Sequence, residues 1–224
     1  MHTRSRFVLG VAVVGAVVLS ACAGTGPPPD GPGVRPPAPA AAAAAPRSLG
    51  EVPLPNEGER STAPDVSDWT TSTVTQQPWL LEPCGPTAYP TDAARTSFRT
   101  VSRSGPQFEA ARQLAVYPSP EHAAETVTGF RRVIEACGTG GRVGAGTARW
   151  DTRYLPDLGD EGFVAAGTVA GPGYAPNGDR IAVTRVGSAV FLASVHGRYA
   201  TTKLDDGVGE VRRVAEQFLG SVGR

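Results

Sequence analysis

The chain has 224 residues, with 21 lysines and arginines against 21 aspartates and glutamates, so its formal net charge at pH 7 is zero. It contains no basic stripe interleaved with aromatic residues, and this argues against nucleic acid as a partner, because a phosphate backbone is bound by clustered positive charge. Residues 66–224 have the length of one ordinary domain, so we expect a single folded domain there.

The first 22 residues have the pattern of a bacterial lipoprotein signal. Arg4 and Arg6 precede an apolar run, Phe7 to Leu19, which is shorter than the about 20 residues that a membrane span needs. The sequence Leu-Ser-Ala-Cys that ends at Cys22 resembles a lipobox. The resemblance implies that residues 1–21 are removed as a signal peptide and that Cys22 is lipidated. Acyl chains such as palmitate then anchor the protein on the outer face of the cell membrane.

Residues 22–65 are predicted to be a tether between this lipid and the domain. Eleven of the 21 prolines and an alanine run, Ala40 to Ala45, fall in this segment, which has few large apolar residues. Such a composition cannot bury a core and favours extended geometry, so we expect a spacer that holds the domain away from the bilayer. A proline-rich ligand for partner proteins is the alternative.

The first half of the domain predicts extended segments followed by a helix. Trp69 to Leu81 is β-prone, and Arg95 to Arg103 with Gln107 to Tyr117 predicts a hairpin around Ser104-Gly105-Pro106. Ser119 is a good N-cap for a helix that Gly138 can end. Apolar residues at three- and four-residue spacings predict one buried face: Ala123, Val127, Phe130, Val133, Ile134 and Cys137.

The second half predicts further strands and a terminal helix. Strands are expected at Thr147 to Arg153 and Phe163 to Val169, and a hairpin joins Ile181 to Val186 with Ala189 to Val195 through Gly187-Ser188. The helical spacing then continues over Val208, Val211, Val214, Ala215, Phe218 and Leu219. This order predicts an α+β fold, with an antiparallel sheet packed against two or three helices.

With Cys22 assigned to lipid, Cys84 and Cys137 remain. Because an extracytoplasmic compartment is oxidising, we expect them to form one disulfide that staples the domain. Two free buried thiols are the alternative. A zinc site is disfavoured, since the two cysteines have no nearby cysteine or histidine pair to complete four ligands.

No complete catalytic motif is present. The glycines from Gly138 to Gly146 follow a helix instead of opening one, and they lack the spacing of a phosphate loop. His122-x-x-Glu125 lacks the second histidine of a zincin helix, and no GxSxG or SxxK pattern occurs. His196 has no identifiable carboxylate or nucleophile partner. We therefore expect no catalytic residue, metal or cofactor, with a cell-wall hydrolase as a weaker alternative.

Three residues are candidates for ligand binding. Asp160 and Glu161, together with Asp157, form an acidic group that could act as an acid pair or a cation site, although glycines on either side also suit a solvated turn. Tyr174 lies in a stretch too rich in turn residues to bury every side chain, which suggests the rim of a binding loop. Core packing is the simpler interpretation for the other large aromatic residues: Trp69, Trp79, Trp150 and Tyr154.

The order of these signals resembles a known family. The features are Trp79 before Cys84, a strand ending Leu114-Ala115-Val116-Tyr117, a helix ending at Cys137, Leu158-Gly159-Asp160-Glu161-Gly162, and Arg180 to Ser188. They resemble the extracellular sensor domains of actinobacterial receptor-type serine/threonine kinases and of free-standing lipoproteins. A second cysteine pair, common in the kinase sensors, is missing.

The resemblance implies an α+β domain that binds something outside the membrane, and it brings no catalytic residue. The leading hypothesis is therefore a ligand-binding or sensor-like lipoprotein for an envelope component such as a lipid, glycan or peptide. A structural or interaction protein of an envelope complex is the alternative.

Overall fold

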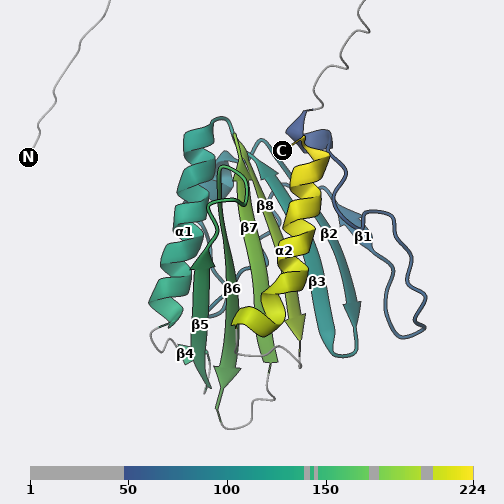
Figure 1. Ribbon diagram of the computed structural model, residues 1–224, viewed down its shortest axis with the longest axis vertical. Helices are drawn as coiled ribbons and strands as arrows, with labels where there is room; N and C mark the ends of the chain where they lie inside the picture. Colours follow the sequence, from purple (N-terminus) through teal and green to yellow (C-terminus); the bar gives the residue numbers. More distant parts are fainter. Residues whose placement is uncertain (1–47, 139–141, 144–145, 172–176, 198–203, 224) are drawn as a thin grey trace, which may run out of the picture. The chain divides into compact units, whose positions relative to one another are not determined.

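The computed structural model describes residues 48–138, 142–143, 146–171, 177–197 and 204–223. The chain divides into two units after Ala44, and every described residue belongs to the second unit. The described residues form one eight-stranded antiparallel sheet, ordered β1-β2-β3-β8-β7-β6-β5-β4, and two α-helices (Figure 1). This confirms the predicted α+β class.

The first half of the domain follows the local signals of the sequence. Ser119 caps the first α-helix, since its hydroxyl accepts the His122 backbone N–H at 3.5 Å, and Pro120 is the first helical residue, where its missing N–H costs nothing. The elements are η1 (Leu49–Glu51), β1 (Thr70–Ser72), η2 (Pro90–Ala94), β2 (Ser97–Gly105), β3 (Phe108–Val116) and α1 (Pro120–Gly138).

The second half contains the predicted hairpin and terminal helix. Gly187 has φ of +55°, which suits the two-residue turn that pairs Val186 with Ala189. The elements are β4 (Arg142–Val143), β5 (Gly146–Tyr154), β6 (Glu161–Ala170), β7 (Asn177–Val186), β8 (Ala189–Gly197) and α2 (Leu204–Ser221). Within the described ranges, no helix combines the length and the apolar character needed to cross a membrane.

The two helices cover opposite faces of the sheet. Along β8, Val190 and Leu192 belong to the cluster that contains α1, whereas Phe191 and Ala193 belong to the cluster that contains α2. Successive strand residues point to opposite faces, so this alternation separates the two cores. On the α2 side, the Phe191 and Phe218 rings stack with centroids 4.4 Å apart. In α1, five of the six predicted positions are buried and Val133 is partly buried.

The N-terminal boundary differs from the prediction. Val52 and Leu54 are 2% and 3% exposed and belong to the α2-side core, and Arg99 donates a hydrogen bond to the Val52 carbonyl. The predicted start at residue 66 therefore lies too far along the chain, because two apolar residues between prolines suffice to pack a segment against the sheet. From Trp69 to Leu81, only Thr70–Ser72 forms a strand.

Candidate functional site

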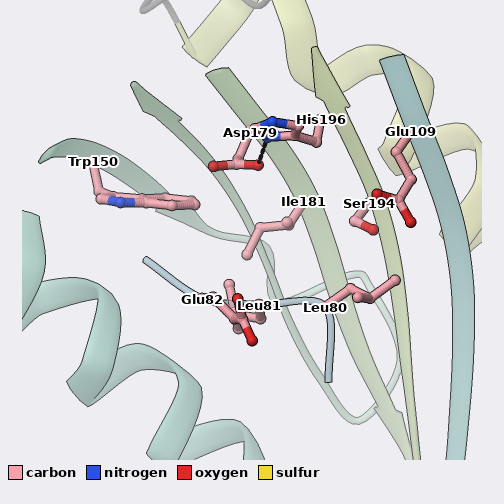
Figure 2. Close-up of a pocket in the computed structure, with 9 residues that line it drawn as sticks. All are labelled: Leu80, Leu81, Glu82, Glu109, Trp150, Asp179, Ile181, Ser194 and His196. Atoms are coloured by element: carbon pink, nitrogen blue, oxygen red, sulfur yellow. Dashed lines mark hydrogen bonds and ion pairs between the residues drawn. The ribbon is translucent and has the colours of Figure 1, made fainter. Parts of the chain in front are cut away.

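A cavity of about 250 Å³ lies on the face of the sheet that α1 covers (Figure 2). The strands supply Glu109 from β3, Ser194 and His196 from β8, Asp179 and Ile181 from β7, and Trp150 from β5. The loop after β1 supplies the remaining described lining residues, Leu80, Leu81 and Glu82.

Strand register brings most of the polar groups into one row. Glu109 is paired with His196 and His196 with Asp179, so these side chains of β3, β8 and β7 share one face of the sheet. The row continues through Gly167 of β6 to Trp150 of β5. A Cβ atom at Gly167 would overlap the Trp150 ring. The missing side chain therefore lets the indole lie against the sheet and form a wall of the cavity.

The loop that forms the opposite wall is held by a buried side chain. Gln113 of β3 is fully buried; its Oε1 accepts the Leu80 N–H at 2.7 Å, and its Nε2 donates to the Pro78 carbonyl at 3.0 Å. Nε2 also lies 3.2 Å from the Thr100 hydroxyl, to which it donates. The Leu80 N–H and the Pro78 carbonyl have this partner in only one position of the loop, so the hydrogen bonds to Gln113 favour that position.

Three further contacts fix the same loop. Tyr89 donates its hydroxyl to the Leu81 carbonyl at 2.7 Å, and the Trp150 indole N–H donates to the Pro83 carbonyl at 3.3 Å. Burial raises the pKa of Tyr89 above its ordinary value of 10.0, so the phenol remains a donor. The predicted disulfide is confirmed: Cys84 is bonded to Cys137, with Cα atoms 5.8 Å apart, and ties the loop to the end of α1.

His196 has a carboxylate partner, contrary to the expectation from sequence. Its Nδ1 lies 2.7 Å from Asp179 Oδ1, and the hydrogen bond with Asp179 raises the pKa of His196 above 6.5, against an opposing effect of burial. The sequence does not predict this pairing, because turn-forming residues dominate the stretch that ends at Asp179 and the predicted strand ends at Val195. The two-residue turn at Gly187-Ser188 sets the register that places residue 179 opposite residue 196.

Ser194 lies one pair deeper on the same face, opposite Ile181. It is 9% exposed and lines the cavity, and its hydroxyl has no hydrogen-bond partner among the residues that the structure describes. Buried hydroxyl groups normally have a partner. This group is therefore available to a molecule that enters the cavity.

Asp160 and Glu161 have contacts elsewhere. Asp160 Oδ2 accepts the Gly187 N–H at 2.7 Å and lies 3.5 Å from Arg185 Nη1. Glu161 forms ion pairs with Arg131 of α1 and with Arg185, whose Nε lies 3.6 Å from Glu161 Oε2. Neither residue is among the described lining of the cavity. Their observed contacts hold the segment before β6 to the β7–β8 turn.

The remaining sequence candidates fall in different places. Cys22 and Tyr174 lie outside the described residues. Trp69 and Trp79 are buried in the two cores, as expected for packing, whereas Tyr154 is 52% exposed. Gln113 is not among the candidates that the sequence predicts. The signal that could have found it is an amide directly before the apolar run Leu114 to Val116, since a buried amide needs partners.

Comparison with known proteins gives likeness only at low similarity. No protein-family model matches the sequence, and no curated protein matches it. The crystal structure of the extracellular domain of PknH from Mycobacterium tuberculosis is similar, with a TM-score of 0.44 and 13% identity, over 58% of this chain. The match covers 66% of that chain, just under two thirds of it. A likeness at this level identifies no function.

Proposed function

We propose that this chain is a lipid-anchored extracytoplasmic binding protein, a ligand-binding or sensor-like module for an envelope component. Its ligand site is the cavity between Trp150 and the loop at Leu80 to Glu82. The observation that carries the proposal is the fixed wall of this cavity, which is held by Gln113, Tyr89, Trp150 and the disulfide.

A fixed wall favours binding for a physical reason. A site whose loop is already ordered loses less conformational entropy when a ligand enters than a site whose loop must be ordered at that moment. Here the backbone of three loop residues, Pro78, Leu80 and Leu81, is held by side chains of other segments. The cavity also combines apolar side chains with polar and charged groups that could orient a ligand.

The location in the proposal rests on the sequence. The lipobox-like segment ending at Cys22 supplies the anchor, and the proline-rich segment after it supplies the spacer. A stabilising disulfide is typical of domains in oxidising compartments, which agrees with a site outside the cytoplasm.

The test is native mass spectrometry of the lipidated full chain, purified from its native membrane and followed by extraction of bound molecules. Ser194→Leu fills the floor of the cavity with an apolar side chain and should abolish retention of any ligand. Ser102→Leu is the matched control, because Ser102 lies in the same row of the same sheet face but outside the described lining of the cavity.

A small molecule retained by the wild type and Ser102→Leu, but absent from Ser194→Leu, supports the proposal. Equal retention by all three chains would place the ligand elsewhere and overturn it. Recovery of a stoichiometric protein with an empty cavity would favour the structural or interaction role instead.

One observation favours a second candidate, a hydrolase. Ser194 and the Asp179–His196 pair line the same cavity, and a serine, a histidine and an acid are the groups of a nucleophilic triad. Among the described residues, however, no hydrogen bond joins Ser194 to His196. Turnover of an ester or cell-wall substrate that both Ser194→Ala and His196→Gln abolish would establish this candidate.

A further inference from the structure

Acidic side chains dominate the polar lining of the cavity. The carboxylates of Glu82, Glu109 and Asp179 line it, and its described lining includes no lysine or arginine. His196 supplies at most one positive charge, so the site has a net charge of about −2 with the imidazole protonated and about −3 with it neutral. Like charges close together repel one another, and a bound cation relieves that repulsion.

The carboxylates at the two sides of the cavity are available to a ligand. Glu82 and Glu109 are exposed, and neither carboxylate has a hydrogen bond or ion pair with a described residue. Asp179 uses Oδ1 for His196. A carboxylate accepts several hydrogen bonds, so a ligand that donates N–H groups can be bound by these acids together.

The Ser194 hydroxyl gives independent evidence for a ligand. It is nine-tenths buried and lines the cavity without a described partner (Figure 2). A ligand that carries a polar hydrogen or a lone pair can form a hydrogen bond with this hydroxyl. It lies next to the row of Glu109, His196 and Asp179 on the same face of the sheet, so a ligand that contacts the hydroxyl also lies beside these acids.

The rest of the lining suits a short aliphatic body. Leu80, Leu81 and Ile181 provide apolar surface, and the indole of Trp150 forms a wall. An indole can stabilise a neighbouring cation through its ring quadrupole as well as contact methylene groups. The cavity of about 250 Å³ is smaller than the about 300–1,000 Å³ of sites that enclose drug-sized ligands, so it fits a small group.

From these observations we infer that the cavity binds an alkylammonium group, a protonated amine on a short aliphatic chain. The inference rests on the proposed function of the cavity as a ligand site and names the chemical class of its ligand. A free diamine and the side-chain amine of a larger envelope molecule share this chemistry.

Isothermal titration of the full chain carrying Cys22→Ser with 1,5-diaminopentane tests the inference. The neutral compound 1,5-pentanediol is the matched control, because it has the same chain length and two polar ends but no charge. We expect saturable binding of the diamine and at least tenfold weaker binding of the diol. Glu109→Gln and Asp179→Asn should each weaken diamine binding about fivefold, as expected for a partly exposed charge pair of about 1 kcal/mol.

Glu125→Gln is the matched control variant, since it removes one exposed carboxylate of α1 outside the described lining of the cavity and should leave the affinity unchanged. If Asp179→Asn proves unstable, Glu109→Gln still tests the inference, because Glu109 is exposed and has no described partner to lose. Equal affinities for diamine and diol, or diamine binding that survives both cavity substitutions, would overturn the inference.

The two proposals can fail separately. If Ser194→Leu removes an envelope ligand while diamine and diol bind alike, the cavity is a ligand site and the alkylammonium assignment is wrong. If native mass spectrometry finds no cavity ligand and the diamine does not bind, both are wrong. Capture of amine-bearing cell-wall peptides, but not of their N-acetylated forms, would identify the larger molecule as the source; binding of the free diamine without such capture would identify a soluble amine.

Discussion

Gln113 and Leu80 are joined by a hydrogen bond of 2.7 Å between the side-chain oxygen of one and the backbone N–H of the other. The contact links a fully buried position of β3 to the loop that walls the cavity, across 33 residues of sequence. The position of that wall therefore depends on a side chain that does not itself line the cavity.

Gln113→Leu should destabilise the domain and weaken ligand binding together. The substitution leaves the Leu80 N–H and the Pro78 carbonyl without their partner, and a buried unsatisfied group costs about 1–3 kcal/mol. We expect a loss of about 3 kcal/mol in the free energy of unfolding, measured by urea denaturation. Gln107→Leu, in the exposed turn between β2 and β3, is the control; equal stability of the two variants would contradict the role of Gln113.

Removal of the disulfide should have a larger effect on stability. The bond closes a loop with a sequence separation of 53 residues, and the chain-entropy model gives a stabilisation of about 4 kcal/mol for a loop of this size. The double variant Cys84→Ser with Cys137→Ser should therefore lose about 4 kcal/mol in the free energy of unfolding and unfold at a lower urea concentration than the wild type. A reducing agent should shift the wild type to the same midpoint and leave the double variant unchanged; a wild type insensitive to reduction would contradict the prediction.

Local signals were sufficient to predict the helices and hairpins. Ser119 and Pro120 start α1 through contacts within one turn of helix, and Gly187-Ser188 fixes the β7–β8 hairpin through its own backbone geometry. These determinants lie within a few residues of the element that they define, so they can be recognised without knowledge of the fold.

The cavity depends on contacts between segments that lie far apart in the sequence, and local sequence signals do not predict such contacts. The Gln113 amide reaches a loop more than 30 residues earlier, and nothing near it in sequence indicates that partner. The Asp179–His196 pair lies between these two cases. The turn at Gly187-Ser188 sets the register of the hairpin, and this register pairs Asp179 with His196 when both strands continue to these residues. The prediction of a ligand site at Asp160 and Glu161 rests on their acidity, which does not reveal that arginines lie beside them.

Asp160→Asn should affect the turn and leave the cavity unchanged. The Asp160 carboxylate accepts the Gly187 N–H and lies near Arg185, and one partly exposed interaction of this kind is worth about 1 kcal/mol. We expect a small loss of stability and the wild-type affinity for 1,5-diaminopentane. A tenfold loss of affinity without a change in stability would instead give Asp160 a direct role in binding.

Cys22→Ser should release the protein from the membrane. The predicted anchor consists of acyl chains on this thiol, and each buried methylene contributes about 0.8 kcal/mol to membrane binding. Metabolic labelling with an alkyne fatty acid should mark the wild type and leave the variant unlabelled. Cell fractionation should move the variant from the membrane to the soluble fraction. Cys84→Ser is the control, and labelling that persists in Cys22→Ser would contradict the assignment.

The affinity for an alkylammonium ligand should rise with pH. The hydrogen bond with Asp179 raises the pKa of His196 above 6.5. Near neutral pH, His196 is therefore protonated in a fraction of the protein molecules, and its positive charge repels the ligand. The charged groups that act on His196 are Asp179 of β7 and Glu109 of β3, and Glu82 of the loop lines the same cavity. Deprotonation of His196 removes the repulsion while the alkylammonium stays charged, because its pKa lies near that of lysine, about 10.4.

Stability should change in the opposite direction over the same interval. A raised folded pKa means that the stabilisation from His196 is complete below pH 6.5 and is lost as the pH rises through the folded pKa. The effect is small, since the His196 side chain is 53% exposed.

Titration of the His196 ring by NMR should show the pKa of His196 falling when 1,5-diaminopentane binds, as linkage requires. An unchanged His196 pKa in the presence of saturating diamine would place the cation outside the cavity.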